Sequence, residues 1–171
     1  MALRDTLLRA AEADLYRQHL SAEILEEFRR NLVRRYQVSG DLKAQRAINT
    51  MRRAFPGAEV TGYHPLIASM TNDPKDRHVV AAAVSVGARV IVTSNLRHFR
   101  KRDLAPFNVE ARSPDDFLTQ LYHLAPADMT RILVEQAAKL KNPPMTPVEV
   151  LSELAKPAPT FAGLVRPNLP A

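Results

Sequence analysis

The stretch DPKDRHVVAAAVSVGARVIVTSNLRHF, residues 73–99, carries the pattern from which the fold is predicted. Its first half, from about residue 74 to 86, is alanine-rich and apolar on most sides, which indicates a buried helix. Gly87 follows where a helix C-terminal cap favours glycine. The run ARVIVTS is rich in β-branched residues and is typical of a strand buried on both faces. A buried helix leading directly into a buried strand predicts an α/β protein.

The pattern outside this stretch adds further helices and strands. Helical spacing of apolar residues predicts helices over residues 3–15, from Ser21 to about 38, and from about 42 to 55. Short strands are predicted within residues 16–20, 58–63 and 108–111, and a helix from Ser113 to about 121. This alternation favours an α/β fold with a parallel sheet covered by helices, followed by a small helical C-terminal extension.

The pattern changes after residue 124. Two short helices with proline near their first turns are followed by KPAPTFAGLVRPNLPA, in which four prolines predict an extended or disordered tail. We therefore predict a main domain over residues 1–124, and a helical extension with a proline-rich tail over residues 125–171.

Composition narrows the class of protein. The chain has no cysteine, which excludes disulfides and thiolate zinc sites, and no apolar run approaches the ~20 residues of a membrane span. We therefore expect a cytoplasmic protein. The 24 basic against 18 acidic residues favour an anionic partner such as nucleic acid, although a charge that only promotes solubility is the alternative.

Asp73 and Asp76 lie one helical turn apart at the start of the buried helix. They fit a helix cap followed by an acidic first turn, which is a sufficient structural explanation. They also fit metal ligands, because the next strand ends in Thr93, Ser94 and Asn95, and the carboxyl ends of parallel strands form ligand sites. Oxygen atoms gathered there would suit a hard cation.

Residues 73–99 resemble the PIN-domain family, and within it the VapC-like toxins. The shared features are Asp-x-x-hydrophobic-Ala-Ala-Ala, the small-residue helix, the β-branched strand, and Thr-x-Asn followed by Phe; the segment SAEILEEFRRNL resembles the family's second motif. The resemblance implies a PIN-like three-layer α/β/α fold with a parallel sheet. It also implies a metal-dependent endoribonuclease using Mg²⁺ or Mn²⁺, and the toxin of a type II toxin–antitoxin system. Its implied partners are RNA, a cognate antitoxin and a second copy of the chain in a homodimer.

The resemblance also assigns the site. The second-motif glutamate matches Glu27, with Glu23 and Glu26 as competing neighbours; the third-motif aspartate matches Asp76, with Asp73 as a helper; and the last polar position matches Asn95. These four, Glu27, Asp76, Asp73 and Asn95, are the predicted catalytic and metal-binding residues. The predicted RNA-binding residues are Thr93, Ser94, Arg97, Arg100, Lys101 and Arg102. For the four basic residues, a solvated loop is the alternative. His78 is interpreted as a packed helix histidine, and His98 as a phosphate contact or a rim residue.

One departure from the family concerns its first motif, a hydrophobic strand ending in aspartate. No such strand precedes Leu3, and Asp5 lies inside a helical pattern. Three explanations are open: a start that lies upstream, a strand donated by another chain, or a degenerate fold. The third gives the alternative function, a catalytically impaired PIN-like module that binds an antitoxin or RNA without cleaving it.

Overall fold

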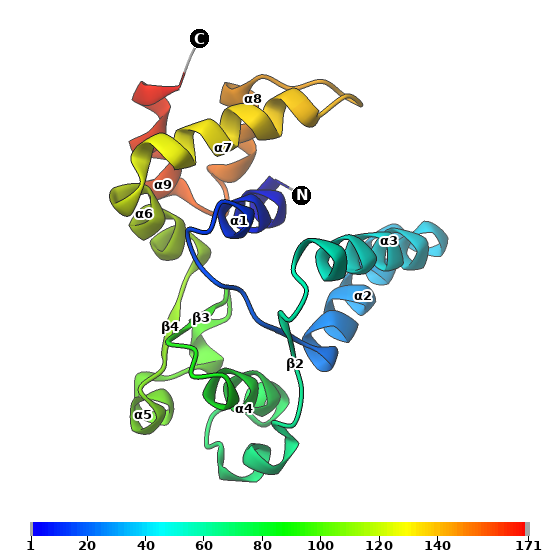
Figure 1. The fold of residues 1–171 in the computed structure, drawn as a ribbon, viewed down its shortest axis with the longest axis vertical. Helices are drawn as coiled ribbons and strands as arrows, with labels where there is room; N and C mark the ends of the chain where they lie inside the picture. Colours follow the sequence, from blue (N-terminus) through cyan, green and yellow to red (C-terminus); the bar gives the residue numbers. More distant parts are fainter. Residues whose placement is uncertain (1, 170–171) are drawn as a thin grey trace. The chain divides into compact units, whose positions relative to one another are not determined.

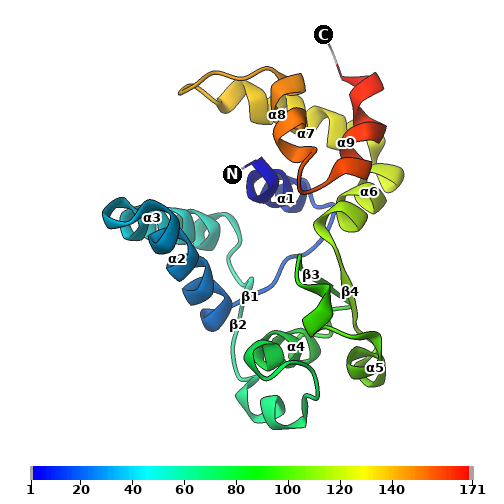
Figure 2. The same ribbon diagram turned by 180° about the vertical axis from the view of Figure 1, so that it is seen from behind.

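The computed structural model describes residues 2–169, shown from two sides in Figures 1 and 2. The chain packs as two compact units, and the segments that form them alternate along the sequence. The helical unit comprises the described residues of Met1–Arg17, Val92–Ser94 and Arg112–Ala171, and the mixed unit comprises Gln18–Ile91 and Asn95–Ala111. Each unit is described by itself below.

A pair of long helices forms the first part of the mixed unit. Helices α2 (Ala22–Tyr36) and α3 (Val38–Ala54) lie side by side (Figure 1). Ser21 caps α2 as predicted, because its side chain accepts a hydrogen bond from the backbone of Ile24 at 3.2 Å. Helix α3 begins earlier than the predicted residue 42. Gly40 permits this, since a Cβ at that position would lie 2.5 Å from the carbonyl oxygen of Leu32.

Within residues 2–169, four short strands form two pairs. Strand β1 (Leu20–Ser21) pairs in parallel with β2 (Glu59–Val60), and β3 (Val90–Val92) pairs with β4 (Glu110–Arg112). In the second pair, the amide of Glu110 donates to the carbonyl of Arg89 and the amide of Thr93 donates to the carbonyl of Arg112, both at 2.9 Å. These bonds advance in the same direction along both strands, as in a parallel ladder.

Short helices complete the mixed unit and carry its polar residues. The predicted helix over residues 74–86 is present as a 3-10 turn followed by an α-helix, and Gly87 ends it with φ of 66°. Its buried face joins the core around Tyr63, Val80, Phe99 and Leu104. The elements are η1 (His64–Ser69), η2 (Pro74–Asp76), α4 (Arg77–Ser85), η3 (Leu96–His98), α5 (Lys101–Leu104) and η4 (Ala105–Phe107).

The helical unit joins segments far apart in the sequence. Helix α1 (Ala2–Glu12) packs against α7 (Pro126–Lys139) and α8 (Pro147–Leu154), and α6 (Pro114–Leu124) packs against α9 (Pro159–Val165). Inside, the hydroxyl of Thr6 lies 2.8 Å from Oε1 of Gln136, and both side chains are fully buried. Ser113 caps α6 and a capping box at Thr146 starts α8.

The prediction of an extended or disordered tail was wrong within the described residues. Residues 159–165 form α9, and η5 (Arg166–Asn168) follows it. Pro159 stands at the first helical position, where its missing N–H costs nothing. Asp115 accepts hydrogen bonds from the amides of Thr160 and Phe161 at 3.1 and 2.9 Å, and Phe161 and Val165 are fully buried. Packing against α6 therefore overrides the high proline content.

The mixed α/β class, the parallel strand pairing and the C-terminal helices are confirmed. Among the residues that the structure describes, the strands form two pairs and no strand joins them into one sheet. Helix α1 precedes β1 in the chain, and its presence agrees with the amphipathic pattern of residues 3–15. Within residues 2–169, no helix combines the length and the hydropathy needed to cross a membrane.

Candidate metal centre

The two aspartates of the opening stretch differ in their local roles. The side chain of Asp73 accepts a hydrogen bond from the amide of Lys75 at 3.1 Å and so caps η2, with Pro74 at the first helical position. Asp76 precedes α4 and its side chain makes no capping hydrogen bond. Helix capping therefore explains Asp73 but not Asp76, whose carboxylate contacts a residue outside the helix.

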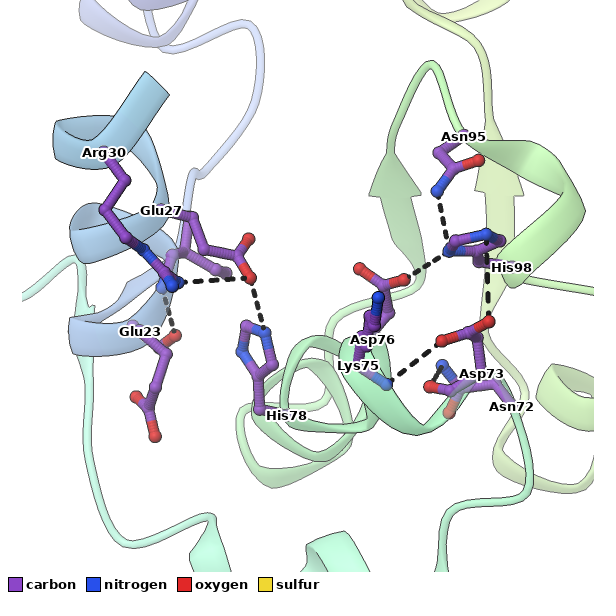
Figure 3. Close-up of polar contacts among 12 residues, drawn as sticks. Glu23, Glu27, Arg30, Asn72, Asp73, Lys75, Asp76, His78, Asn95 and His98 are labelled. Carbon is purple, nitrogen blue, oxygen red and sulfur yellow. Dashed lines mark hydrogen bonds and ion pairs between the residues drawn. The ribbon is translucent and has the colours of Figure 1, made fainter. Parts of the chain in front are cut away.

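The partner of Asp76 is His98. Nδ1 of His98 lies 2.6 Å from Oδ2 of Asp76, and its Nε2 lies 3.7 Å from Oδ2 of Asp73 (Figure 3). The backbone supports this arrangement, because the amide of Asp73 contacts the carbonyl of His98 at 3.4 Å. The imidazole thus lies between two carboxylates that come from a different segment of the mixed unit.

Asp73, Asp76 and His98 form what we call the acidic group. Each offers one ligand atom, and the three atoms lie within 4.8 Å of one another on partly exposed side chains. Carboxylate oxygens and imidazole nitrogens are the usual protein ligands of Mn²⁺ and related divalent ions. The neighbouring Asn72 is 2% exposed, and its side-chain oxygen has no hydrogen-bond partner among the described residues. The donor set and this buried acceptor both fit a divalent cation.

Asn95 contacts the acidic group from the loop after β3, and Arg97 contacts Asn95. The side-chain nitrogen of Asn95 lies 2.7 Å from Nδ1 of His98, and its oxygen accepts a hydrogen bond from Nε of Arg97 at 3.1 Å. Two residues predicted from the sequence, one for the metal and one for RNA, are therefore linked to the same histidine. The Asn95 side chain contacts His98, which in turn contacts Asp76.

Glu27, the predicted second-motif ligand, lies outside the acidic group. Its Oε1 contacts Nε2 of His78 at 3.3 Å and Arg30 at 4.0 Å (Figure 3). His78 is two residues beyond Asp76, so Glu27 faces the same helix through an intermediate side chain. The other ring nitrogen of His78, Nδ1, is buried without a hydrogen-bond partner in the part of the chain described.

The neighbouring glutamates of α2 have other partners. Glu23 accepts a hydrogen bond from the hydroxyl of Tyr63 and contacts Nε2 of His64 at 2.7 Å. Glu26 pairs with Arg29 at 2.8 Å, and this hydrogen bond lowers the pKa of the Glu26 carboxyl. Of the three glutamates, Glu27 alone contacts a side chain of α4.

The other predicted RNA-binding residues are divided between the two units, with the basic residues in the mixed unit and Thr93 and Ser94 in the helical unit. Arg100 and Arg102 both approach the buried carboxylate of Asp103, at 3.1 and 3.9 Å, and Lys101 is exposed. Thr93 and Ser94 belong to the helical unit, so their position relative to the acidic group stays a prediction. Asp5 also belongs to that unit, where it pairs with Arg9 one helical turn away at 3.0 Å.

The sequence did not predict the contacts of His98 with the two aspartates. The sequence indicates a phosphate contact or a rim residue, whereas the structure places His98 between Asp73 and Asp76. The available signal was its spacing from Asn95, three residues along the loop at the carboxyl end of a buried strand. Nothing in the sequence relates it to Asp76, 22 residues earlier, because that contact depends on the tertiary fold.

Two family models match parts of this chain. Residues 2–97 match the PIN domain, and residues 114–167 match the VapC50 C-terminal domain. The chain therefore belongs to the PIN-domain family, and its VapC-like resemblance is confirmed.

A curated relative is named "Putative ribonuclease VapC50" and comes from Mycobacterium tuberculosis strain ATCC 25618 / H37Rv. It is 41% identical over 110 residues, which cover 64% of this chain and 65% of the relative. The match thus spans less than two thirds of the relative's length. No solved structure gives a significant match.

Proposed function

We propose that this chain is a metal-dependent endoribonuclease of the PIN type. The observation that supports the proposal best is the convergence of Asp73, Asp76 and His98 within 4.8 Å. The similarity to a protein named as a ribonuclease supports the choice of RNA as the substrate. The net charge of +6 also favours a polyanionic substrate.

Asp73 and Asp76 would hold the cation through carboxylate oxygens, and His98 through a ring nitrogen. When bound, a divalent cation lowers the pKa of a water molecule and neutralises charge on the reacting phosphate. A histidine ligand favours Mn²⁺ over Mg²⁺, because Mg²⁺ prefers a shell of oxygen atoms only. We therefore propose Mn²⁺ as the better supporting ion and Mg²⁺ as the weaker one.

The remaining residues orient the site and the substrate. Asn95 contacts the imidazole of His98, and Arg97 can donate to a phosphate oxygen while its Nε holds Asn95. Glu27 acts through His78 on helix α4, which follows Asp76 directly. In the hydrolysis, the oxygen of one water bonds to phosphorus, the bond to the departing ribose oxygen breaks, and that oxygen receives a proton.

The biological role that we propose is the toxin of a type II toxin–antitoxin pair. The VapC-like resemblance supports this role, together with a cytoplasmic location, a cognate antitoxin and a homodimer. Expression of the chain in bacteria should arrest growth, and co-expression of the antitoxin should relieve the arrest. Light scattering on the purified chain tests the homodimer. Growth unaffected by expression of the folded protein would contradict the toxin role.

The central experiment is cleavage of RNA by the purified full chain. We expect cleavage in Mn²⁺, less in Mg²⁺, and none in a chelator. Asp76→Asn should reduce the rate on the order of 100-fold or more, because it removes charge from the acidic group. Glu153→Gln, at an exposed position of α8, is the matched control and should keep the rate. Cleavage that survives either the chelator or Asp76→Asn would contradict the proposal.

One observation favours the alternative of an impaired module. Glu27 is engaged by His78, and Asn95 brings no charge, so only two carboxylates meet in the acidic group. A folded chain that binds Mn²⁺ and RNA without any cleavage would support this alternative over the enzyme.

A further inference from the structure

A pocket of about 760 Å³ opens in the mixed unit between the loop after β3 and the start of β4. Its apolar lining includes Phe99, Leu104 and Val109, all nearly buried. The backbone closes its wall, because the amide of Glu110 donates to the carbonyl of Arg89 at 2.9 Å. The volume lies within the ~300–1,000 Å³ typical of small-ligand sites.

The polar lining of the pocket is mainly cationic. Arg89, Arg100 and Lys101 are exposed at it, against the single carboxylate of Glu110. Arg100 is oriented by the hydrogen bond from its Nε to buried Asp103 at 3.1 Å, and this bond leaves the terminal guanidinium nitrogens for another acceptor. Asn108 adds an exposed amide, which offers both a donor and an acceptor.

The pocket shares one short element with the acidic group. Helix η3 spans Leu96–His98; Leu96 lines the pocket, and His98 contacts Asp76. A polymer whose phosphodiester lies at the acidic group can therefore reach the pocket by passing over η3. The ligand of the pocket is then a neighbouring unit of the same polymer.

A nucleotide matches the three kinds of lining group together. Its base has apolar faces for Phe99, Leu104 and Val109, its base edge has donors and acceptors for Asn108, and its phosphate suits arginine and lysine. An acidic protein segment would pair with the cationic side chains but would leave the apolar lining without a partner. The lining therefore favours RNA over a protein partner.

We propose that this pocket, lined by Arg89, Phe99, Arg100, Lys101, Leu104 and Asn108, binds one nucleotide of single-stranded RNA next to the phosphodiester that is cut. We call it the flanking-nucleotide pocket. The inference rests on the proposed ribonuclease function and extends it, because it assigns a substrate subsite that includes Arg89 and Asn108.

The test is binding of a fluorescent pentanucleotide RNA in a chelator, so that no cleavage occurs. The double variant Arg89→Gln/Lys101→Gln should weaken binding about tenfold or more. It should also reduce the slope of log affinity against log salt concentration by the equivalent of about one to two phosphate contacts. Ala105→Trp, which narrows the pocket and keeps every charge, should also weaken binding. Lys156→Gln, an exposed lysine on the turn after α8, should bind as the unchanged chain does.

Two readouts separate this inference from the proposed function. Thermal unfolding and Mn²⁺ titration of each variant should match the unchanged chain, since none alters the acidic group. Unchanged RNA affinity in both pocket variants would overturn the inference even if Asp76→Asn abolishes cleavage. If the unchanged chain bound an acidic peptide, and both pocket variants lost that binding with RNA binding intact, the inference would also be overturned. The pocket would then be assigned to a protein partner. Weakened RNA binding without any cleavage by the unchanged chain would support the pocket and reject the nuclease.

Discussion

Nδ1 of His98 lies 2.6 Å from the carboxylate of Asp76 and 2.7 Å from the amide nitrogen of Asn95. One ring nitrogen either carries a hydrogen or offers a lone pair, so it satisfies one of these contacts at a time. Protonated, Nδ1 donates to Asp76; unprotonated, it accepts from Asn95. In the first arrangement the neutral ring keeps its lone pair on Nε2, beside Asp73, where it can bind a cation. In the second arrangement the carboxylate of Asp76 is released, but Nε2 carries the hydrogen and cannot bind a cation.

Replacing His98 tests whether the imidazole is a ligand. We expect His98→Ala to weaken Mn²⁺ binding about tenfold or more and to reduce the preference for Mn²⁺ over Mg²⁺, because only oxygen ligands remain. Calorimetric titration with each ion measures both effects. His123→Ala, an exposed histidine of α6, is the control. Tighter binding of both ions by His98→Ala would show that His98 competes with the metal.

Glu27 is the second position to test. Because Glu27 contacts His78 and lies outside the acidic group, Glu27→Gln should slow cleavage by about tenfold, less than Asp76→Asn. Glu26→Gln, on the same helix and paired with Arg29, is the matched control and should keep the rate. Equal losses from Glu27→Gln and Asp76→Asn would indicate that Glu27 joins the metal centre directly.

The pair of Thr6 and Gln136 should stabilise the helical unit. Thr6→Val leaves a buried side-chain carbonyl without its donor, so we expect a loss of about 1–3 kcal/mol in the free energy of unfolding. Thr130→Val removes a hydroxyl from the exposed side of α7 and should cost much less. Urea unfolding of both variants measures the difference. Similar losses would mean that the buried hydrogen bond adds no stability of its own.

Tyr16 gives the helical unit a dependence on alkaline pH. Burial raises the pKa of its hydroxyl from 10.0 to about 12, since the charged form would lose its hydration. The folded state therefore holds its proton longer than the unfolded state. This contribution to stability is complete below pH 10 and is lost as pH rises through about 12.

Tyrosinate absorbance during an alkaline titration checks this order. Of the four tyrosines, we expect Tyr16 to contribute a late component to this titration. That late component should disappear in Tyr16→Phe and persist in Tyr36→Phe. Its persistence in Tyr16→Phe would assign it to another tyrosine.

The sequence predicted what depends on neighbours along the chain. The cap at Ser21, the helix and strand within residues 74–94, and the end of that helix at Gly87 follow from local spacing and turn chemistry. The PIN family followed from the same stretch. The predicted residues Asp73, Asp76 and Asn95 lie together in the structure, linked through His98.

The sequence could not predict what depends on contacts between distant segments. The helix α9 forms in a proline-rich tail because Asp115 binds its first turn and Phe161 is buried. Likewise, Glu27 contacts His78, 51 positions along the chain, instead of the acidic group. Local propensity contains no information on either partner.

The hydrogen bond between Thr6 and Gln136 spans 130 positions of the chain and sets an order of assembly during synthesis. All residues of the mixed unit, including the acidic group, precede residue 112, so they leave the ribosome before α7 does. Helix α1 must wait for α7 and α8 before its apolar face is covered. We therefore expect a nascent chain to acquire its candidate cation-binding residues in native register while its first helix is still exposed to chaperones.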